Sequence, residues 1–356
     1  MGLSPLHAIA GDKAAGLAAP ELLQRLEQWL CREARATQFV IKQISMLSGG
    51  AIQENWSLSA EVTGGPHAGP HDWVLRTDAP SAVAVSLTRA QEYAVLRVAH
   101  NAGVQVARPL WLCQDAQVIG RDFFIMERLP GIAAAHRVTR DATVVPDGPR
   151  LAVELGVNLA MLHAVEPPNV DLSFLPLPAG NPALEAIANY RAYLDEIGST
   201  HPVVELGLRW CELNAPETWR VCLIHRDYRT GNYMVHGGRL AGVLDWEFTG
   251  WGDPREDIGW FTAKCWRFAG RQRDAGGIAG SEDFMRGYLA AGGSPATAAD
   301  LRYWQAMAHL RWAVIALQQA ERHLSGRQCS LELALTGRLV VDLEYEILKL
   351  IGEDHA

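Results

Sequence analysis

Three polar side chains near the middle of the sequence have the types and the order that phosphoryl transfer requires. Asp227 comes first, Asn232 follows it closely, and Asp245 stands further along the chain. A carboxylate can receive the proton of an acceptor hydroxyl, while an amide oxygen and a second carboxylate can hold Mg²⁺ on nucleotide phosphates. A turn whose side chains only satisfy backbone groups is the alternative, but it does not explain residue type, order and spacing together. We therefore interpret this segment as a kinase-type catalytic loop.

The elements around these residues explain how they could meet. An apolar strand end precedes the loop, and residues 233–244 are predicted to form a β-hairpin with its turn at 236–239. Because a hairpin brings its ends together, Asn232 and Asp245 are expected to lie side by side, with Asp227 nearby.

The same segment resembles a known superfamily. The pattern His-x-Asp-x-x-x-x-Asn, followed by an apolar residue, Asp and Trp, resembles the aminoglycoside phosphotransferase (choline/fructosamine kinase-like) superfamily of small-molecule kinases. Residues 244–247 and 252–260 are similar to the branch related to the kinase-like domain fused to some acyl-CoA dehydrogenases. The resemblance covers roughly residues 37–350 and is sharpest over 223–260. It implies an α+β, two-lobed protein-kinase-like fold, with a small antiparallel-sheet amino lobe and a larger, mainly helical carboxy lobe.

Two segments of the amino lobe are expected to meet the nucleotide phosphates. Ser48, Gly49 and Gly50 lie between two predicted strands, and glycine lets backbone N–H groups approach phosphate oxygens; an ordinary hairpin turn is the alternative. Arg76 stands where kinases carry a strand Lys, and Glu92 is placed to orient it. A guanidinium can bridge a phosphate and a carboxylate, so we expect Arg76 to serve catalysis and nucleotide binding. A surface salt bridge is the alternative for this pair.

A third segment is expected to contact the nucleotide base. Met126, Glu127 and Leu129 belong to a stretch that resembles the strand-to-hinge connection whose backbone meets adenine. Met126 would be either an apolar wall of that pocket or plain core. The cofactors implied are ATP or GTP, together with Mg²⁺ held by Asn232 and Asp245.

Other residues near the loop have expected supporting roles. His225 is expected to hold the loop rather than to transfer a proton, and Asp257 is expected to brace it through backbone N–H groups. Glu247 could assist a second Mg²⁺ or hold the loop. His309 and Arg311, on a late helix, are candidates for the acceptor cleft, and a structural role is the alternative.

Periodicity and turn residues predict the organisation of the chain. Residues 1–19 are expected to be a disordered tail, 20–129 the amino lobe with the nucleotide-phosphate loop, and 130–356 the helical carboxy lobe with the catalytic loop and acceptor site. In the amino lobe we predict a helix at 86–101 and strands at 39–44, 55–62, 73–77, 111–112 running into 118–119, and 123–126. In the carboxy lobe we predict helices at 148–165, 184–198, 201–214, 281–291, 298–323 and 330–351.

Composition limits the functional class. The chain has 356 residues, 49% hydrophobic and 20% charged, as in a globular enzyme. A net charge of −8 argues against a nucleic-acid-binding protein. No apolar run approaches the roughly 18 residues of a membrane-spanning helix, and the amino terminus lacks a signal-peptide pattern. We therefore expect a cytoplasmic protein that binds neither nucleic acid nor membranes.

The predicted function is an ATP- or GTP-dependent, Mg²⁺-dependent phosphotransferase that acts on a hydroxyl group of a small molecule. For the acceptor, the branch resemblance implies a hydroxyacyl-CoA or related acid, and the wider superfamily implies an aminoglycoside or other antibiotic. A pseudokinase that binds nucleotide without turnover is a third alternative, against which the intact catalytic set argues. A basic run suits an anionic acceptor such as a CoA ester, although solvated surface charge explains it equally well. That run consists of Lys264, Arg267, Arg271 and Arg273.

Overall fold

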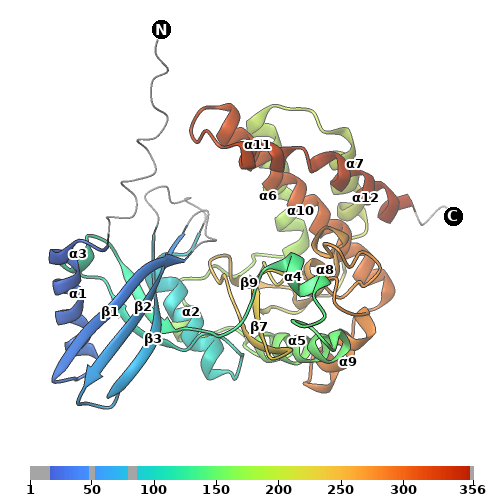
Figure 1. Cartoon of the computed structure of the whole chain (residues 1–356). Coiled ribbons are helices and arrows are strands. Elements are labelled where there is room, and N and C mark those ends of the chain that lie inside the picture. The colour runs from blue at the N-terminus through green and yellow to red at the C-terminus, as the bar shows by residue number, and fades with distance from the viewer. Residues whose placement is uncertain (1–16, 48–52, 79–85, 353–356) are drawn as a thin grey trace, which may run out of the picture. The chain divides into compact units, whose positions relative to one another are not determined.

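The computed structural model describes residues 17–47, 53–78 and 86–352 and contains two compact units (Figure 1). One unit consists of Met1–His100 with Ala107–Leu129, and the other of Asn101–Val106 with Pro130–Ala356. The first holds a five-stranded antiparallel sheet and the second is mainly helical. The predicted α+β fold class is therefore confirmed. The predicted tail, 1–19, lies mostly outside the described residues.

The sheet of the first unit has the strand order β1-β2-β3-β5-β4. All neighbouring strands pair antiparallel. The strands of the sheet are β1 (Gln38–Leu47), β2 (Gln53–Thr63), β3 (Gly69–Asp78), β4 (Pro109–Cys113) and β5 (Phe123–Glu127). The helices that accompany this sheet are α1 (Pro20–Glu33), α2 (Arg89–Asn101) and α3 (Ala116–Ile119).

The two faces of this sheet are covered by different helices. Phe123 of β5 packs its ring on Trp29 of α1, with centroids 4.9 Å apart. The next residue, Phe124, lies 5.9 Å from the ring of Tyr93 on α2. Because side chains alternate along a strand, Arg76, which pairs with Phe124 in register, belongs to the α2 face. The alternation thus points Arg76 towards the helix that carries its predicted partner.

One strand prediction was wrong. Residues 118–119 form the end of the short helix α3 rather than a strand. The Asp115 side chain accepts from the N–H of Gln117 at the start of this helix, and Gly120 ends it with a φ of 86°. A capping residue and a terminating glycine so close together favour one helical turn over an extended chain.

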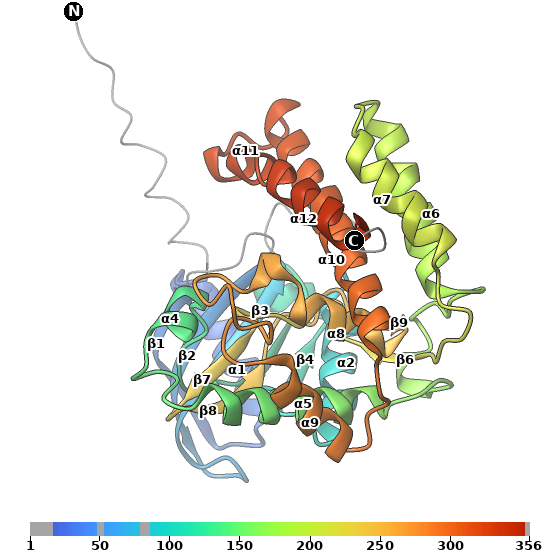
Figure 2. The ribbon, with the colours of Figure 1, turned by 90° about the vertical axis from the view of Figure 1, so that its right-hand side faces the viewer.

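The second unit is built around one long helix, α10 (Figure 2). In Figure 2, α6 and α7 run side by side, and α12 lies along α10. The helices of this unit are α4 (Ala135–Arg140), α5 (Gly148–His163), α6 (Pro182–Ile197), α7 (Pro202–Leu213), α8 (Pro254–Thr262), α9 (Ser281–Ala290), α10 (Ala298–Leu324), α11 (Leu331–Gly337) and α12 (Val340–Gly352), with 3₁₀ turns at η1 (Val170–Leu172) and η2 (Lys264–Trp266). In the part of the chain that the structure describes, no helix is both long and apolar enough to span a membrane.

The predicted helix at 330–351 is two helices. It breaks between Gly337 and Val340, so that α11 and α12 each pack against α10. A Cβ at Gly337 would lie 2.5 Å from the Cβ of Ala320, which shows how closely α11 approaches α10. Packing both segments on one helix requires the turn, and helical periodicity alone does not reveal it.

Two small strand pairs frame the predicted catalytic loop. Strand β6 (Cys222–Ile224) pairs with β9 (Gly250–Gly252), and β7 (Tyr233–His236) pairs with β8 (Arg239–Val243). The predicted hairpin is thereby confirmed. Helix α8, which was not predicted, follows directly with Asp253 as its N-cap.

Candidate active site

The hairpin brings the two ends of the loop region together. Beyond the last paired residues, the N–H of Leu244 donates to the carbonyl of Asn232 at 2.8 Å. Asp245 is the next residue, and its φ of 58° lies in the left-handed region. Asp tolerates this conformation better than most residues, and such backbone strain is concentrated at functional sites.

Three side chains hold the carboxylate of Asp227. The indole N–H of Trp260 donates to Oδ1 at 2.9 Å, and Arg229 Nε donates to the same oxygen at 3.0 Å. The amide of Asn232 donates to Oδ2. The Asp227 side chain remains 14% exposed, so its carboxylate is held in one orientation without being sealed from solvent.

The orientation of Asn232 suits a hard cation. Its amide nitrogen donates both to the Asp227 side chain and to the Asp227 carbonyl, the latter at 3.0 Å. With both N–H groups directed at Asp227, the carbonyl oxygen of Asn232 is the atom left to face a ligand. An amide oxygen and the nearby carboxylate of Asp245 are the oxygen donors that Mg²⁺ prefers. The residues present therefore fit the implied metal.

A buried aspartate braces the backbone of the loop. Asp257, which is fully buried, accepts from the N–H groups of His225 and Arg226, each at 2.7 Å. His163 lies 3.2 Å from Oδ2 through Nε2. Burial alone would raise the pKa of Asp257, but the hydrogen bond from His163 and the loop donors outweigh it and lower the pKa. The carboxylate is thus ionised and fixed by its donors.

His225 supports the loop through both ring nitrogens. Its Nδ1 accepts from the N–H of Asp227 at 3.1 Å, so the proton belongs on Nε2, which donates to the carbonyl of Leu244 at 2.9 Å. Burial lowers the pKa of His225. This geometry matches the expected supporting role.

Arg226 is held in a strained conformation by its neighbours. Its φ is 63°, which costs energy for a residue with a side chain. Its N–H is bonded to Asp257, its carbonyl accepts from Arg311, and its Nη2 donates to the carbonyl of Trp251 at 3.0 Å. The guanidinium of Arg311 also lies over the ring of Trp260, 4.5 Å from its centroid. Arg226, the residue before Asp227, is therefore fixed by contacts from several elements.

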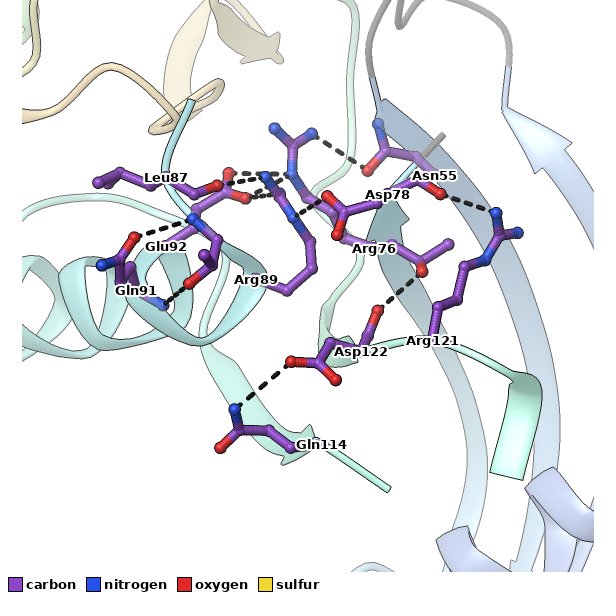
Figure 3. A network of polar contacts seen from close by, with 12 residues as sticks. Asn55, Arg76, Asp78, Leu87, Arg89, Gln91, Glu92, Gln114, Arg121 and Asp122 are labelled. Carbon is purple, nitrogen blue, oxygen red and sulfur yellow. Dashed lines mark hydrogen bonds and ion pairs between the residues drawn. The ribbon is translucent and has the colours of Figure 1, made fainter. Parts of the chain in front are cut away.

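In the first unit, the predicted pair of Arg76 and Glu92 forms, and it is part of a larger network (Figure 3). Arg76 Nε lies 2.9 and 3.0 Å from the two oxygens of Glu92, and Arg76 Nη1 donates to Asn55 at 3.3 Å. Arg89 binds the same carboxylate of Glu92, and its Nε lies 2.9 Å from Asp78. All three charged groups at the centre are buried, so this is not the surface salt bridge considered as the alternative.

Comparison with known proteins decides the family. The model of the phosphotransferase enzyme family matches residues 43–308, well over half of the chain. This chain belongs to the phosphotransferase enzyme family. The predicted enzyme class is thereby confirmed.

Individual relatives of this phosphotransferase agree with the predicted branch. Acyl-CoA dehydrogenase family member 10 of Mus musculus is 26% identical over 275 residues, which cover 73% of this chain but only 25% of that protein. A structure from Ralstonia eutropha, described as a candidate aminoglycoside phosphotransferase, has a TM-score of 0.73 at 23% identity and covers 93% of this chain and 98% of its own. A spectinomycin phosphotransferase with ADP and spectinomycin has a TM-score of 0.60 at 12% identity, covering 91% and 98%. At these identities the solved structures show the shared kinase-like fold.

The structure describes only some of the residues that were predicted to contact the nucleotide. Ser48, Gly49 and Gly50 lie outside the described residues. Met126 is half-buried on β5, and Glu127 is exposed, with its N–H bonded to the carbonyl of Arg108 at 2.9 Å.

The basic run after α8 has partners within the protein. Lys264 Nζ lies 2.5 Å from Glu346, and Arg267 donates twice to the carbonyl of Thr262. Arg273 donates to the carbonyl of Thr139 at 2.6 Å. Three of the four residues of the run, Lys264, Arg267 and Arg273, therefore have partners within the protein.

His309 and Arg311, the two candidates for the acceptor cleft, lie in different surroundings. His309 is buried, its Nδ1 lies 2.7 Å from the carbonyl of Gln305, and burial lowers its pKa to about 4. Arg311 instead lies beside the loop and lines a pocket. Glu247 is buried, which is compatible with both of its predicted roles.

The sequence interpretation missed three contacts of the predicted residues. Trp260 and Arg229 bind Asp227, and Arg89 shares Glu92. Arg89 precedes Glu92 by one helical turn, a spacing that favours an ion pair and could have indicated it. Trp260 stands in the recognised motif but gave no signal of its role.

Proposed function

We propose that this chain is a cytoplasmic, Mg²⁺-dependent kinase that transfers the γ-phosphoryl group of ATP, or of GTP, to a hydroxyl group of a small molecule. Residues 20–129 would form the amino lobe and 130–356 the carboxy lobe. The observation that carries the proposal is the fixed carboxylate of Asp227, which three donors orient while part of it faces solvent.

In this proposal Asp227 orients the acceptor hydroxyl and accepts its proton as the phosphoryl group is transferred. Its hydrogen bonds to Trp260 and Asn232 leave it little freedom to rotate, and fixed positioning is the main source of rate in this chemistry. The guanidinium of Arg229, 3.0 Å from Asp227, places a positive charge beside the point where phosphoryl oxygens gain charge.

The metal and nucleotide residues act through charge. Asn232 and Asp245 would hold Mg²⁺, which neutralises phosphate charge when it is bound. Arg76 would contact the phosphates while Glu92 orients it. Ser48, Gly49 and Gly50 would cover the phosphates, and Met126, Glu127 and Leu129 would line the base.

For the acceptor, a hydroxyacyl-CoA or related hydroxy acid is the leading candidate. The support is the relationship to acyl-CoA dehydrogenase family members 10 and 11 over their kinase-like region. Because the chain spans only 25% of the former, the activity of that whole protein is not transferred to it. An aminoglycoside acceptor is the second candidate, since spectinomycin phosphotransferase shares the fold.

The test is a product assay with the purified full chain. ATP and MgCl₂ are supplied with hydroxyacyl-CoAs, aminoglycosides and amino alcohols, and phosphorylated products are identified by mass spectrometry. We expect a phosphorylated hydroxyacyl product that disappears in Asp227→Asn. Equal product formation by Asp227→Asn and the parent would contradict the assigned role.

A further inference from the structure

Arg311 of α10 contacts the peptide group that precedes Asp227. Its Nη1 donates to the carbonyl of Arg226, across 85 positions of the sequence. The N–H of the same peptide group belongs to Asp227 and donates to Nδ1 of His225 at 3.1 Å. Because a peptide group is planar, contacts at its oxygen and at its nitrogen together fix the plane from which the Asp227 backbone continues. Arg311 therefore supplies one of the two contacts that set the direction of this backbone.

The same guanidinium reaches the side chain of Asp227 through Trp260. It lies over the indole ring, 4.5 Å from the centroid, and the indole N–H donates to Asp227 Oδ1 at 2.9 Å. A cation over the face of an indole is attracted to the ring, and it leaves the N–H at the ring edge available to its acceptor. Arg311 thus acts on Asp227 by two routes, one through the Arg226 carbonyl and one through the indole.

The surroundings of Arg311 suit a residue that orients its neighbours. Its side chain is 14% exposed, and its Nη1 lies 3.9 Å from Glu256. Arg226 has a φ of 63°, a conformation that persists only where the surroundings hold it, and Arg311 provides one of the contacts that do so. A guanidinium combines a flat face for stacking with N–H donors in its own plane, whereas the ammonium of lysine is a point charge. The residue type therefore matters for carrying out both contacts at once.

From these contacts we propose that Arg311 is a positioning residue for phosphoryl transfer, which fixes the backbone and the carboxylate of Asp227 together. It acts on the rate of transfer and not on the binding of the acceptor, the role for which the sequence made it a candidate. This inference rests on the proposed kinase function and deepens the account of the same site.

The chain offers a matched control on the same helix. Arg302 of α10 lies over the ring of Trp210, 5.6 Å from its centroid, as Arg311 lies over Trp260. Trp210 belongs to α7 and takes no part in the contacts of Asp227 described above. Arg302→Met therefore removes an arginine–indole contact from α10 and leaves those contacts of Asp227 in place. The comparison separates a loss of packing on α10 from a loss of positioning.

The experiment measures kcat and KM of the full chain for ATP and for the acceptor identified in the product assay. We expect Arg311→Met to lower kcat at least about tenfold while both KM values stay within about twofold, because misplacing a reacting group lowers the rate without changing binding. Arg302→Met should keep kcat within about twofold of the parent. Arg311→Lys should recover only part of kcat, since its ammonium can donate to the Arg226 carbonyl but cannot stack on the indole in the same geometry.

Two results would overturn the positioning role. One is an equal kcat for Arg311→Met and Arg302→Met. The other is a raised KM for the acceptor at unchanged kcat, which would make Arg311 a binding residue. If Arg311→Met does not fold by circular dichroism, Arg311→Lys carries the test. A kcat at least about threefold below the parent at unchanged KM then supports the proposal, and the kcat of the parent overturns it.

A failure of the kinase function is distinguishable from a failure of the positioning role. If the parent phosphorylates nothing in the product assay, the proposed function fails, and positioning is tested by hydrogen exchange of the Trp260 indole N–H. Its NMR signal is identified by its loss in Trp260→Phe. We expect exchange at least about tenfold faster in Arg311→Met than in Arg302→Met, because the hydrogen bond from the indole to Asp227 opens more often. Equal exchange in the two variants overturns the positioning role.

Discussion

Replacing Asp257 with Asn tests the bracing of the catalytic loop most directly. Its two carboxylate oxygens accept from the N–H groups of His225 and Arg226 and contact His163. An amide can keep only one of these oxygens as an acceptor. The least costly orientation keeps Oδ2, which serves His225 and His163, and turns an NH₂ group towards the N–H of Arg226.

The cost follows from these contacts. One buried backbone N–H loses its acceptor, which costs about 1–3 kcal/mol, and the two remaining bonds lose charge assistance at about 1 kcal/mol each. We therefore expect Asp257→Asn to lower the free energy of unfolding by about 3–5 kcal/mol. Because the displaced N–H belongs to Arg226, next to Asp227, kcat should fall at least tenfold even in the fraction that remains folded.

The pH dependence provides an independent check. The pKa of Asp257 is lowered in the folded protein from an ordinary value of 3.8, so its stabilising contribution is present above that value. It is lost as the pH falls below about 4 towards the folded pKa. The parent should therefore lose stability in this window more steeply than Asp257→Asn.

The measurements are urea unfolding followed by circular dichroism, at neutral pH and between about pH 5 and 3, and steady-state turnover. Asp195→Asn, at an exposed position on α6, is the matched control and should behave as the parent. An Asp257→Asn protein with unfolding free energy within 0.5 kcal/mol of the control, on the order of ordinary surface substitutions, and with turnover within about twofold would refute the reasoning.

Four further outcomes are expected. Asp245→Asn removes the negative charge of a proposed metal ligand and should reduce turnover at least about a hundredfold without unfolding the protein, and near-normal turnover would exclude the metal role. Arg76→Ala should raise KM for ATP while the melting temperature stays within a few degrees, because Arg89 still neutralises Glu92. Unchanged ATP affinity in calorimetry would show that Arg76 has only a structural role. Gly259→Ala should lower both kcat and the melting temperature, because the added Cβ forces α8 away from α10. Gly180→Ala, whose added Cβ meets open space, should change neither, and equal effects of the two substitutions would contradict the close approach of α8 to α10 as the cause. The pKa of His309 is lowered to about 4, so stability should fall by about 3 kcal/mol as the pH drops from about 6.5 to 4, and His309→Gln should flatten this slope in urea titrations.

Local patterns in the sequence were sufficient for much of the fold. Short extended segments with Gly and Pro clustered between them predicted most strands of the sheet, and helical spacing predicted most of α10. The loop and the glycine turn between β7 and β8 predicted the hairpin. In this hairpin the N–H of Leu244 donates to the carbonyl of Asn232 at 2.8 Å. These features depend on neighbouring residues, so the chain encodes them over short distances.

Packing between distant segments decided the rest. Trp260 reaches Asp227 across 33 positions of the sequence, and His163 reaches Asp257 across 94. The break between α11 and α12 exists because both must lie on α10. The sequence by itself was sufficient to propose which residues take part in phosphoryl transfer and to predict the hairpin that joins Asn232 to Asp245. Only the tertiary structure decided which partners orient them, because those contacts form when separate elements pack together.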